Sequence, residues 1–553
     1  MNKRRKVYIV GIDGATFRIL DRLIARGRLP TFASIMERGV RGVLRSTVPA
    51  NSAVAWSTFM TGKNPGKHGV FGFLALAPDG QRLMLTNGGH VKSKTIWEIA
   101  SCAHRRVAVI NVPLTYPPRR VNGALVSGMD ASFLKEFTFP ATLGSELLRL
   151  FPDYAIDLPF VRHASFQAVV ERRAVDLIDV RRRAMFYLLE KIDPDLFVGV
   201  FTTPDRLQHH FWHVLDPTHP RHEDDEPEGA GILSTIYERL DEALGGFLER
   251  MDDQTTLLII SDHGFGGVAR RFLVNRWLSQ MGWLHLKDAP RDSAWARLLR
   301  TVKRHPRLYE SARWMKRRLP GAKHVPLRQR LVARSFFDKV DWSRTRAYYF
   351  PPGIRLNLKG REPCGAVEAG EFESAREELI VALSGLREPL TGEPVFKGVY
   401  RKEEIYAGPH LDRAPDIILD PMQDHDEAKR NFSLGRRLRR RGTEDVFVTD
   451  GPTGDHASEG ILLGVGRLLK SGYRLHGATI ADIAPTVLYG LGLPIPVDMD
   501  GRVLTEMFIS EFAERHPPQF CPSEDASWSS EWQYDQSEEA VIRERLRDLG
   551  YLS

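Results

Sequence analysis

Cysteine and long apolar runs are both scarce in this chain of 553 residues. Only three cysteines occur, Cys102, Cys364 and Cys521, and no CxxC pair is present. This spacing argues against a zinc ribbon and against a disulfide framework. No stretch of about 20 apolar residues occurs, so no transmembrane helix is expected. The apolar run near the N-terminus is too short for the core of a signal peptide, and we therefore expect a cytoplasmic protein.

The composition is otherwise that of a soluble globular protein. Apolar residues make up 42% and charged residues 27% of the chain, and the formal net charge is +8. A moderately basic balance favours anionic ligands, such as phosphate esters, without selecting one of them. The length allows one large α/β enzyme with insertions, or two to three ordinary domains.

Short runs rich in Val, Ile and Leu predict strands that are buried on both faces. They cover residues 7–12, 107–112, 196–201, 257–260, 417–419 and 461–465. Helical periodicity lies between most of them, at 174–189, at 233–251 and at 19–38, where Gly27 and Pro30 are expected to split the helix in two. This alternation predicts an α/β fold with a mostly parallel central sheet and helices on both faces.

The segment 270–346 breaks this rhythm. It is dense in Arg, Lys and Trp, including WARLLRTVKRHPRLYESARWMKRRLPGAKH at 295–324, and it contains no convincing strand. We interpret it as a basic helical cap inserted into a main domain of residues 1–510. The remaining residues, 511–553, are expected to form a polar C-terminal tail that ends in an amphipathic segment at 538–549.

Acidic residues or histidine follow three of the predicted strands. Asp13 follows the first strand, Asp205 follows the strand at 196–201, and Asp262 and His263 follow the strand at 257–260. Because ligand sites of such folds lie outside the carboxyl ends of the strands, these side chains are expected to meet at one edge. His209 lies four residues after Asp205, on the same face if a helix begins there. His456, just before 461–465, is a further candidate.

These residue types suit a hydrolytic metal site. Zinc sites of this kind use neutral imidazole and carboxylate ligands and leave one position open. Two-metal sites for phosphoryl transfer hold their ions about 4 Å apart, with ligands drawn from several loops. A hydroxyl nucleophile would suit such a site. The hydroxyl-rich segment 46–73 offers several, and spacing alone leaves the choice open among Thr47, Ser52, Ser57, Thr58 and Thr61.

The ordered motifs of this chain resemble a known family. They are DG after the first strand, PxxSxxxW followed by TGKNPGKHG, D-x-x-x-H, SDHG and a late G-x-H. Together they are similar to the type I phosphodiesterase/nucleotide pyrophosphatase branch of the alkaline phosphatase superfamily, over about residues 5–505. The late segment TIADIAPTVLYGLGLPIPVDMDGR also resembles the end of that family's catalytic domain. A C-x-P-x-R signature is missing, which argues against a sulfatase.

The resemblance implies a site with two metal ions. Asp205, His209 and His456 would hold one ion, and Asp13, Asp262 and His263 would hold the other. The family's nucleophile precedes the TG dipeptide by nine residues, which corresponds to Ser52, with Thr58 as the second choice. The implied reaction is hydrolysis of a phosphate monoester or diester through a phosphoserine. Zinc suits three His and three Asp, and manganese is the alternative.

One position departs from the family. Nucleotide pyrophosphatases carry an Asn shortly after HG, and Phe73 stands in this region here, so the chain is more similar to prokaryotic proteins described as phosphohydrolases/phosphomutases. Phosphotransfer to an alcohol at the same site is the alternative reaction. A different alternative is a surface-binding protein whose basic segment, residues 270–346, binds acidic lipid or nucleic acid. The expected partner is a small anionic phosphate ester, and specific nucleic-acid binding is not expected.

Overall fold

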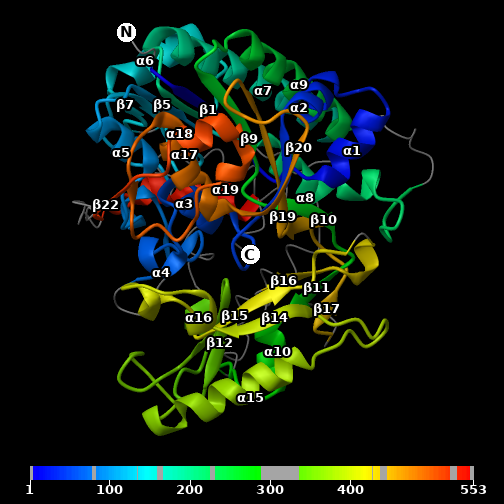
Figure 1. Ribbon diagram of the computed structural model, residues 1–553. Coiled ribbons are helices and arrows are strands. Elements are labelled where there is room, and N and C mark those ends of the chain that lie inside the picture. Colours follow the sequence, from blue (N-terminus) through cyan, green and yellow to red (C-terminus); the bar gives the residue numbers. More distant parts are fainter. Residues whose placement is uncertain are drawn as a thin grey trace, which may run out of the picture.

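The alternating strands and helices form one large sheet in the computed structural model (Figure 1). Nine strands lie in the order β20-β2-β19-β9-β1-β8-β5-β6-β7. The structure describes residues 4–77, 83–133, 135–158, 166–223, 231–287, 336–425, 427–435, 445–523 and 532–548. The strands of the sheet are β1 (Lys6–Ile12), β2 (Val40–Arg45), β5 (Val107–Ile110), β6 (Gly123–Val126), β7 (Thr138–Phe139), β8 (Leu196–Phe201), β9 (Thr255–Ile260), β19 (Glu459–Gly466) and β20 (Tyr473–Thr479).

The sheet is mostly parallel, as predicted. Strand β1 pairs in parallel with β8 and β9, and β5 pairs in parallel with β8 and β6. Strand β19 is antiparallel to both of its neighbours, β2 and β9. The residues of β5, β8 and β9 are all buried, because helices cover both faces of the sheet.

Alternate residues of the central strands enter two different cores. Val7 and Ile9 pack with the apolar side chains of α3 (Ser52–Thr61), α5 (Ile96–Cys102) and α17 (Ile483–Leu491). Tyr8 and Val10 pack on the other face, with α1 (Phe17–Ala25), α2 (Pro30–Arg38), α7 (Phe166–Ile192) and α9 (Ile232–Glu249). The predicted α/β fold with helices on both faces is therefore confirmed.

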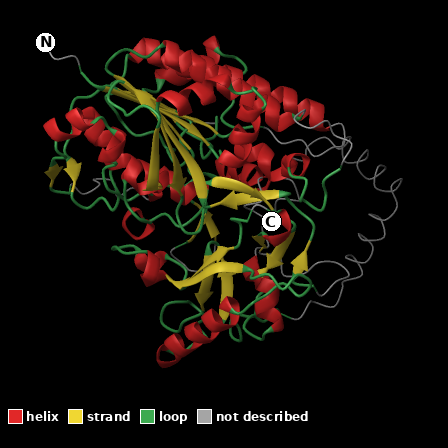
Figure 2. Cartoon of the chain, turned by 45° about the vertical axis from the view of Figure 1, so that its right-hand side comes forward, coloured by secondary structure: helices red, strands yellow, loops and turns green. Residues whose placement is uncertain are grey.

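A second, smaller sheet lies below the large one (Figure 2). Its order is β12-β13-β15-β14, formed by β12 (Ala347–Phe350), β13 (Gly353–Leu356), β15 (Ile417–Pro421) and β14 (Phe396–Arg401), and α15 (Phe372–Ser384) packs against β14. The apolar run at 417–419 is thus a strand, but of this small antiparallel sheet. Its placement in the central sheet was wrong, because a short apolar run carries no information about its pairing partner.

Most of the predicted basic cap, residues 288–335, lies outside the described residues. Its described flanks hold β11 (Arg270–Leu273), α10 (Val274–Gln280) and α14 (Phe336–Lys339). The expectation that this segment contains no strand was wrong for β11, which pairs with β16 (Phe432–Gly435) and β17 (Phe447–Val448). Within the described residues, no helix is both long and apolar enough to span a membrane.

Candidate metal centre

Three adjacent strands deliver the acidic residues to one edge of the large sheet. Asp13 follows β1, and Asp262 and His263 lie between β9 and β10 (Gly264–Gly267). After β8 the chain enters α8 (Thr203–Leu215), whose first turn holds Asp205 and whose second holds His209. Because β9, β1 and β8 are parallel neighbours, their carboxyl ends coincide, as the sequence predicted.

His456 arrives from a distant part of the chain. It lies within β18 (Gly454–Ala457), which pairs antiparallel with β10, so that His456 stands opposite Phe265. This antiparallel pairing stacks the ring of His456 on that of His263, with the ring centroids 3.8 Å apart. A histidine 193 positions away in sequence is thereby added to the sheet edge.

The ligand atoms of Asp13, Asp262 and His263 converge. Nε2 of His263 lies 3.6 Å from Oδ1 of Asp13 and 3.3 Å from Oδ2 of Asp262. All three residues are buried, and their ligand atoms fit within 4.8 Å of one another. This is the grouping that the resemblance implies for one of the two ions.

Asp205, His209 and His456 form a second group beside the first. Oδ1 of Asp205 lies 3.5 Å from Nε2 of His209 and 3.2 Å from Nε2 of His456. The two Nε2 atoms are 3.1 Å apart. His263 connects the two groups, since its Nε2 is 3.9 Å from Oδ1 of Asp205. All six predicted ligands therefore meet at one site.

In the first group, each carboxylate is tethered through one oxygen only. Oδ2 of Asp13 accepts a hydrogen bond of 3.3 Å from the indole of Trp56, and Oδ1 of Asp262 accepts one of 3.3 Å from the backbone of Gly14. Gly14 adopts a φ of +72°, a conformation that glycine provides at low cost. The other oxygens, Oδ1 of Asp13 and Oδ2 of Asp262, are buried without a hydrogen-bond partner among the described residues.

Asp205 also uses only one of its carboxylate oxygens in a hydrogen bond with the described residues. Its Oδ2 accepts a hydrogen bond of 2.7 Å from Nη1 of Arg206, while its Oδ1 is buried without such a partner in the described part of the chain. Arg206 is itself held by Asp157, whose two oxygens lie 3.2 and 3.3 Å from its Nε. Buried carboxylate oxygens are costly to leave unpaired, so these three oxygens, close to one another, form a donor set that suits a cation.

The histidines are oriented to present a lone pair to the same site. Each Nδ1 donates a hydrogen bond to a backbone carbonyl, which can only accept. The distances are 3.0 Å from His209 to Gly454, 2.9 Å from His263 to Gly264 and 3.3 Å from His456 to Ala50. In the neutral ring Nε2 is then the unprotonated atom, and such backing by a carbonyl is typical of histidines that bind metals.

Electrostatics supports the same interpretation. Burial, reinforced by the charges of Asp262 and Asp205, raises the pKa of Asp13 well above its usual range. Burial and the charge of Asp205 raise the pKa of Asp262 to about 7. Burial also lowers the pKa of His263 well below its usual value. Asp13 and Asp262 thus repel one another in a dry site, and a divalent cation would remove this repulsion. The pKa of Asp205 is lowered instead, because His209, His456 and Arg206 outweigh its burial, and Asp205 in turn raises the pKa of His456.

Ser52 lies against this group of ligands. It is the first residue of α3, whose N-terminus is capped by the side chain of Asn51, and its Oγ is 3.0 Å from Nε2 of His263. The other candidate hydroxyls bond elsewhere: Thr47 to Pro49, Ser57 to Ala53, Thr58 to His68 and Thr61 to Ser57. Three-dimensional contacts thus separate five hydroxyls that spacing did not.

Sequence reasoning missed the residues that hold the ligands. Trp56 was visible only as the last letter of the PxxSxxxW motif, and its role depends on Gly11, where a Cβ would come within 2.5 Å of the Trp56 ring. Arg206 is adjacent to Asp205, which was its one available signal. Asp455 also lies near His209 and His456, in a third group of ligand atoms within 4.8 Å of one another.

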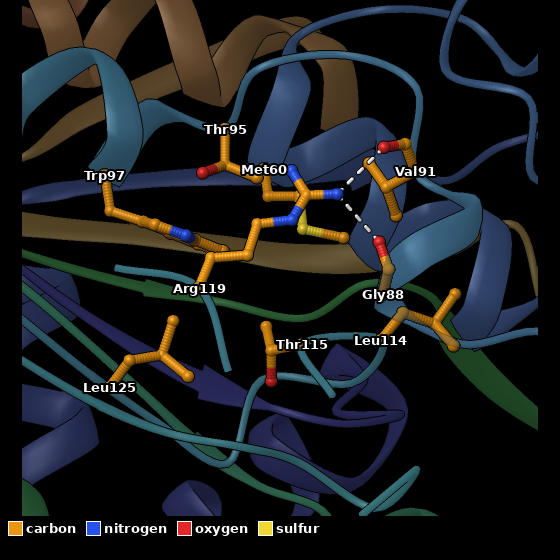
Figure 3. Close-up of a pocket in the computed structure, with 9 residues that line it drawn as sticks. All are labelled: Met60, Gly88, Val91, Thr95, Trp97, Leu114, Thr115, Arg119 and Leu125. Atoms are coloured by element: carbon orange, nitrogen blue, oxygen red, sulfur yellow. Dashed lines mark hydrogen bonds between the residues drawn. The ribbon is translucent and has the colours of Figure 1, made fainter. Parts of the chain in front are cut away.

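A small cavity elsewhere is separate from this site (Figure 3). It is lined by Met60, Gly88, Val91, Thr95, Trp97, Leu114, Thr115, Arg119 and Leu125. Arg119 donates hydrogen bonds to the carbonyls of Gly88 and Val91 across it, at 2.8 and 2.9 Å. It contains neither Ser52 nor any predicted metal ligand.

Solved structures with a similar fold include two hydrolase types. Phosphonoacetate hydrolase from Sinorhizobium meliloti 1021, in complex with phosphonoacetate, has a TM-score of 0.53 and 16% identity, covering 88% of this chain and 95% of that one. Murine ectonucleotide pyrophosphatase/phosphodiesterase 5, as an inactive variant with AMP, has a TM-score of 0.48 and 14% identity, covering 89% and 96%.

The family model gives the decisive match. No curated protein matches the chain significantly. The model described as type I phosphodiesterase / nucleotide pyrophosphatase matches residues 7–431, which include the sheet edge with Asp13, Ser52, Asp205, His209, Asp262 and His263. This match confirms the resemblance drawn from the motifs. The chain belongs to the type I phosphodiesterase/nucleotide pyrophosphatase family of the alkaline phosphatase superfamily.

Proposed function

We propose that this chain hydrolyses phosphate esters at a site with two divalent cations, with Ser52 as the nucleophile. Membership of the family supports a phosphohydrolase, and the family is typically dependent on divalent metals. One observation supports the proposal most strongly. Three buried carboxylate oxygens without partners among the described residues face three histidine Nε2 atoms, and the Ser52 hydroxyl lies against them.

The ligands divide into two sets in this proposal. Asp13, Asp262 and His263 would hold one ion, and the set of Asp205, His209 and His456 would hold the other. Bound there, the ions would lower the pKa of the nucleophilic hydroxyl and stabilise charge on the phosphoryl oxygens. Zinc fits a donor set of three imidazoles and three carboxylates, and manganese is the alternative.

Ser52 is positioned to attack phosphorus. Its oxygen would form a bond to phosphorus while the bond to the leaving oxygen breaks, and the leaving group would depart as an alcohol after taking a proton from water. The Ser52 proton would be lost to solvent. Water would then attack the phosphoserine and release Ser52. Because Ser52 begins α3, the helix N-terminus would stabilise the added negative charge of the phosphoserine.

The substrate is proposed to be a small anionic phosphate ester. Phe73 stands where nucleotide pyrophosphatases carry an Asn, and its side chain is 5% exposed and part of the apolar core. It therefore offers no polar contact to a phosphate, which favours a specificity other than nucleotide pyrophosphates. The phosphonoacetate bound in the similar hydrolase structure is likewise a small anion.

The remaining expectations from the sequence stay predictions. We propose residues 1–510 as the catalytic domain, 270–346 as a basic insertion within it and 511–553 as a C-terminal segment. A cytoplasmic location and peripheral contact of the basic insertion with acidic membranes belong to the same set. Most of the basic insertion, residues 288–335, lies outside the described residues.

A matched pair of serine variants tests the nucleophile. Ser57 lies on the same helix as Ser52, but its hydroxyl donates to the Ala53 carbonyl at 2.7 Å. With aryl phosphate monoesters and diesters as substrates, Ser52→Ala is expected to lower kcat by at least about 10³-fold. Ser57→Ala is expected to keep kcat within about threefold, because an intrahelical hydrogen bond is worth little. Equal turnover by the two variants would exclude Ser52 as the nucleophile.

Product analysis separates hydrolysis from phosphotransfer. When an alcohol acceptor is added, a hydrolase releases phosphate or a phosphomonoester as its main product, whereas a transferase yields the new ester. Mass spectrometry of an acid-quenched reaction should detect a phosphate on Ser52 in either case. A phosphorylated residue other than Ser52 would contradict the assignment.

A further inference from the structure

A buried network of charges lies behind the Asp205 side of the site. Asp205 is oriented by Arg206, and Arg206 is oriented by Asp157. The side chains of all three are at most 3% exposed. Arg206 also contacts Met129, with its Nη2 3.0 Å from the sulfur. The direction in which Asp205 presents its unpaired oxygen therefore depends on what holds Asp157 and Met129.

The C-terminal helix α19 (Gln536–Asp548) packs against the large domain (Figure 1). Ile542 and Leu546, four residues apart on one face, are 2% exposed and belong to the core. Glu538 is fully buried and accepts hydrogen bonds of 2.6 Å from the Tyr116 hydroxyl and 3.1 Å from the Ser132 hydroxyl. The amphipathic segment predicted near the C-terminus is thus a helix packed on the large domain.

Arg545 connects this helix to the network. Its Nη1 donates hydrogen bonds to the carbonyl of Ala131, at 3.0 Å, and to the carbonyl of Met129. Its Nε lies 3.9 Å from Oδ2 of Asp157. Arg545 and Arg206 therefore share the same two neighbours, Asp157 and Met129.

We propose that Arg545 is a positioning residue for Asp205, so that the C-terminal helix helps to orient a ligand of the metal site. Arg545 fixes the backbone at Met129 and Ala131 and faces Asp157, and these fix Arg206. Arg206 in turn points Oδ1 of Asp205 toward His209 and His456. This inference rests on the proposed function, because it assumes that Asp205 binds a metal ion.

Arg543 on the same helix is a matched control. Its Nε donates to Glu539 at 2.7 Å and its Nη2 to the Leu83 carbonyl at 2.9 Å, so it anchors the same helix to a different place. Loss of either arginine removes one guanidinium and two hydrogen bonds with described residues. Only Arg545 contacts the network behind Asp205.

The test compares Arg545→Met with Arg543→Met in the full-length protein. The readout is the dissociation constant of Zn²⁺, measured by competition with a chelator, together with the melting temperature of the metal-free protein. Arg545→Met is expected to weaken binding of the more weakly held ion by about tenfold, the usual lower range for a residue that orients a ligand. Arg543→Met is expected to change it by less than about twofold, since it lies outside the network.

Two further variants keep the outcome decisive. If Arg545→Met does not fold, Arg545→Lys and Arg543→Lys take the place of the pair, and the same difference in metal affinity, reduced in size, is expected. Asp205→Asn separates this inference from the proposed function. If Asp205→Asn weakens Zn²⁺ binding and the two arginine variants bind it equally, the positioning role is wrong; if Asp205→Asn also binds normally, the proposed metal site is wrong.

Discussion

Buried carboxylates have different surroundings at the edge of the large sheet and beside the small sheet. Asp416, which directly precedes β15 of the small sheet, is fully buried, and both of its oxygens are used. Arg361 donates to Oδ1 and to Oδ2 at 2.7 Å each, and the Leu356 backbone donates to Oδ2 at 2.9 Å. Lys402 adds a second cation at 3.5 Å. Both oxygens of Asp416 therefore find their hydrogen-bond donors within the chain.

At the edge of the large sheet, each carboxylate of the site leaves one oxygen without a hydrogen-bond partner among the described residues. Asp13 and Asp262 each use one oxygen for a neutral hydrogen bond and leave the other unpaired among the described residues. The opposite pKa shifts follow from this difference: Arg361 outweighs burial and lowers the pKa of Asp416, whereas burial and neighbouring carboxylates raise the pKa of Asp262 to about 7. Asp205, the third carboxylate at this edge, is paired with Arg206 through one oxygen and its pKa is lowered, but its other oxygen is also without a hydrogen-bond partner among the described residues. The unpaired buried oxygen, rather than the direction of the pKa shift, is therefore what distinguishes the three carboxylates of the sheet edge from Asp416.

The largest expected effect is the loss of activity in Asp262→Asn. The Asn carbonyl can keep the hydrogen bond from Gly14, but its amide replaces the ligand oxygen. We expect turnover to fall by at least about 10³-fold, because metal ions contribute several kcal/mol to such reactions. The metal-free variant should also melt at a higher temperature than the metal-free wild type, since a repulsive charge is gone. If metal-free Asp262→Asn melted at a lower temperature than the metal-free wild type and kept normal turnover, Asp262 would have the structural role expected of Asp416, and the proposed difference between the two regions would be wrong.

Asp416→Asn should have the reverse profile. It leaves Arg361 and Lys402 without their buried partner, and we expect a loss of about 3 kcal/mol in the free energy of unfolding. Zinc affinity and kcat of the folded fraction should stay at wild-type values, because Asp416 directly precedes β15 of the small sheet. Urea denaturation and a zinc titration measure both quantities. Weakened zinc binding in the folded variant would show that the two regions are coupled.

The pH dependence of stability sharpens the comparison further. The pKa of Asp262 rises from 3.8 to about 7 on folding without metal. Its favourable contribution is therefore complete below about pH 4 and is lost as the pH rises to 7. The pKa of Asp416 is lowered, so its contribution is complete above about pH 4 and is lost in more acidic solution.

Melting temperatures with a chelator present test these signs. Relative to the wild type, Asp262→Asn should gain stability between pH 4 and pH 7, and the deficit of Asp416→Asn should shrink below about pH 4. Parallel curves for both variants and the wild type would contradict the two pKa shifts.

Much of the site was predictable because it depends on strand ends. Asp13, Asp205, Asp262 and His263 each follow a buried apolar run, and parallel strands bring such positions together by geometry alone. The helix at Asp205 and His209 also follows from local spacing. These features need only the pattern of the chain within about ten residues.

The remainder depends on contacts between distant residues. The choice of Ser52 over Thr58 depends on His263 and His68, and the strand at 417–419 found its partners in the small sheet. The docking of α19 rests on buried Glu538 and on the hydrogen bonds of the partly buried Arg545, and charged residues in a polar tail give no local signal of burial. Pairings of this kind are fixed by tertiary packing, which a single sequence does not specify.

The central claim is that two divalent cations bind at the edge of the large sheet. Anomalous diffraction at the zinc edge, from crystals of the full-length protein loaded with Zn²⁺, tests it most directly. We expect one peak among Asp13, Asp262 and His263 and a second among Asp205, His209 and His456. Absence of a peak at both ligand sets would contradict the account, whatever activity the protein showed.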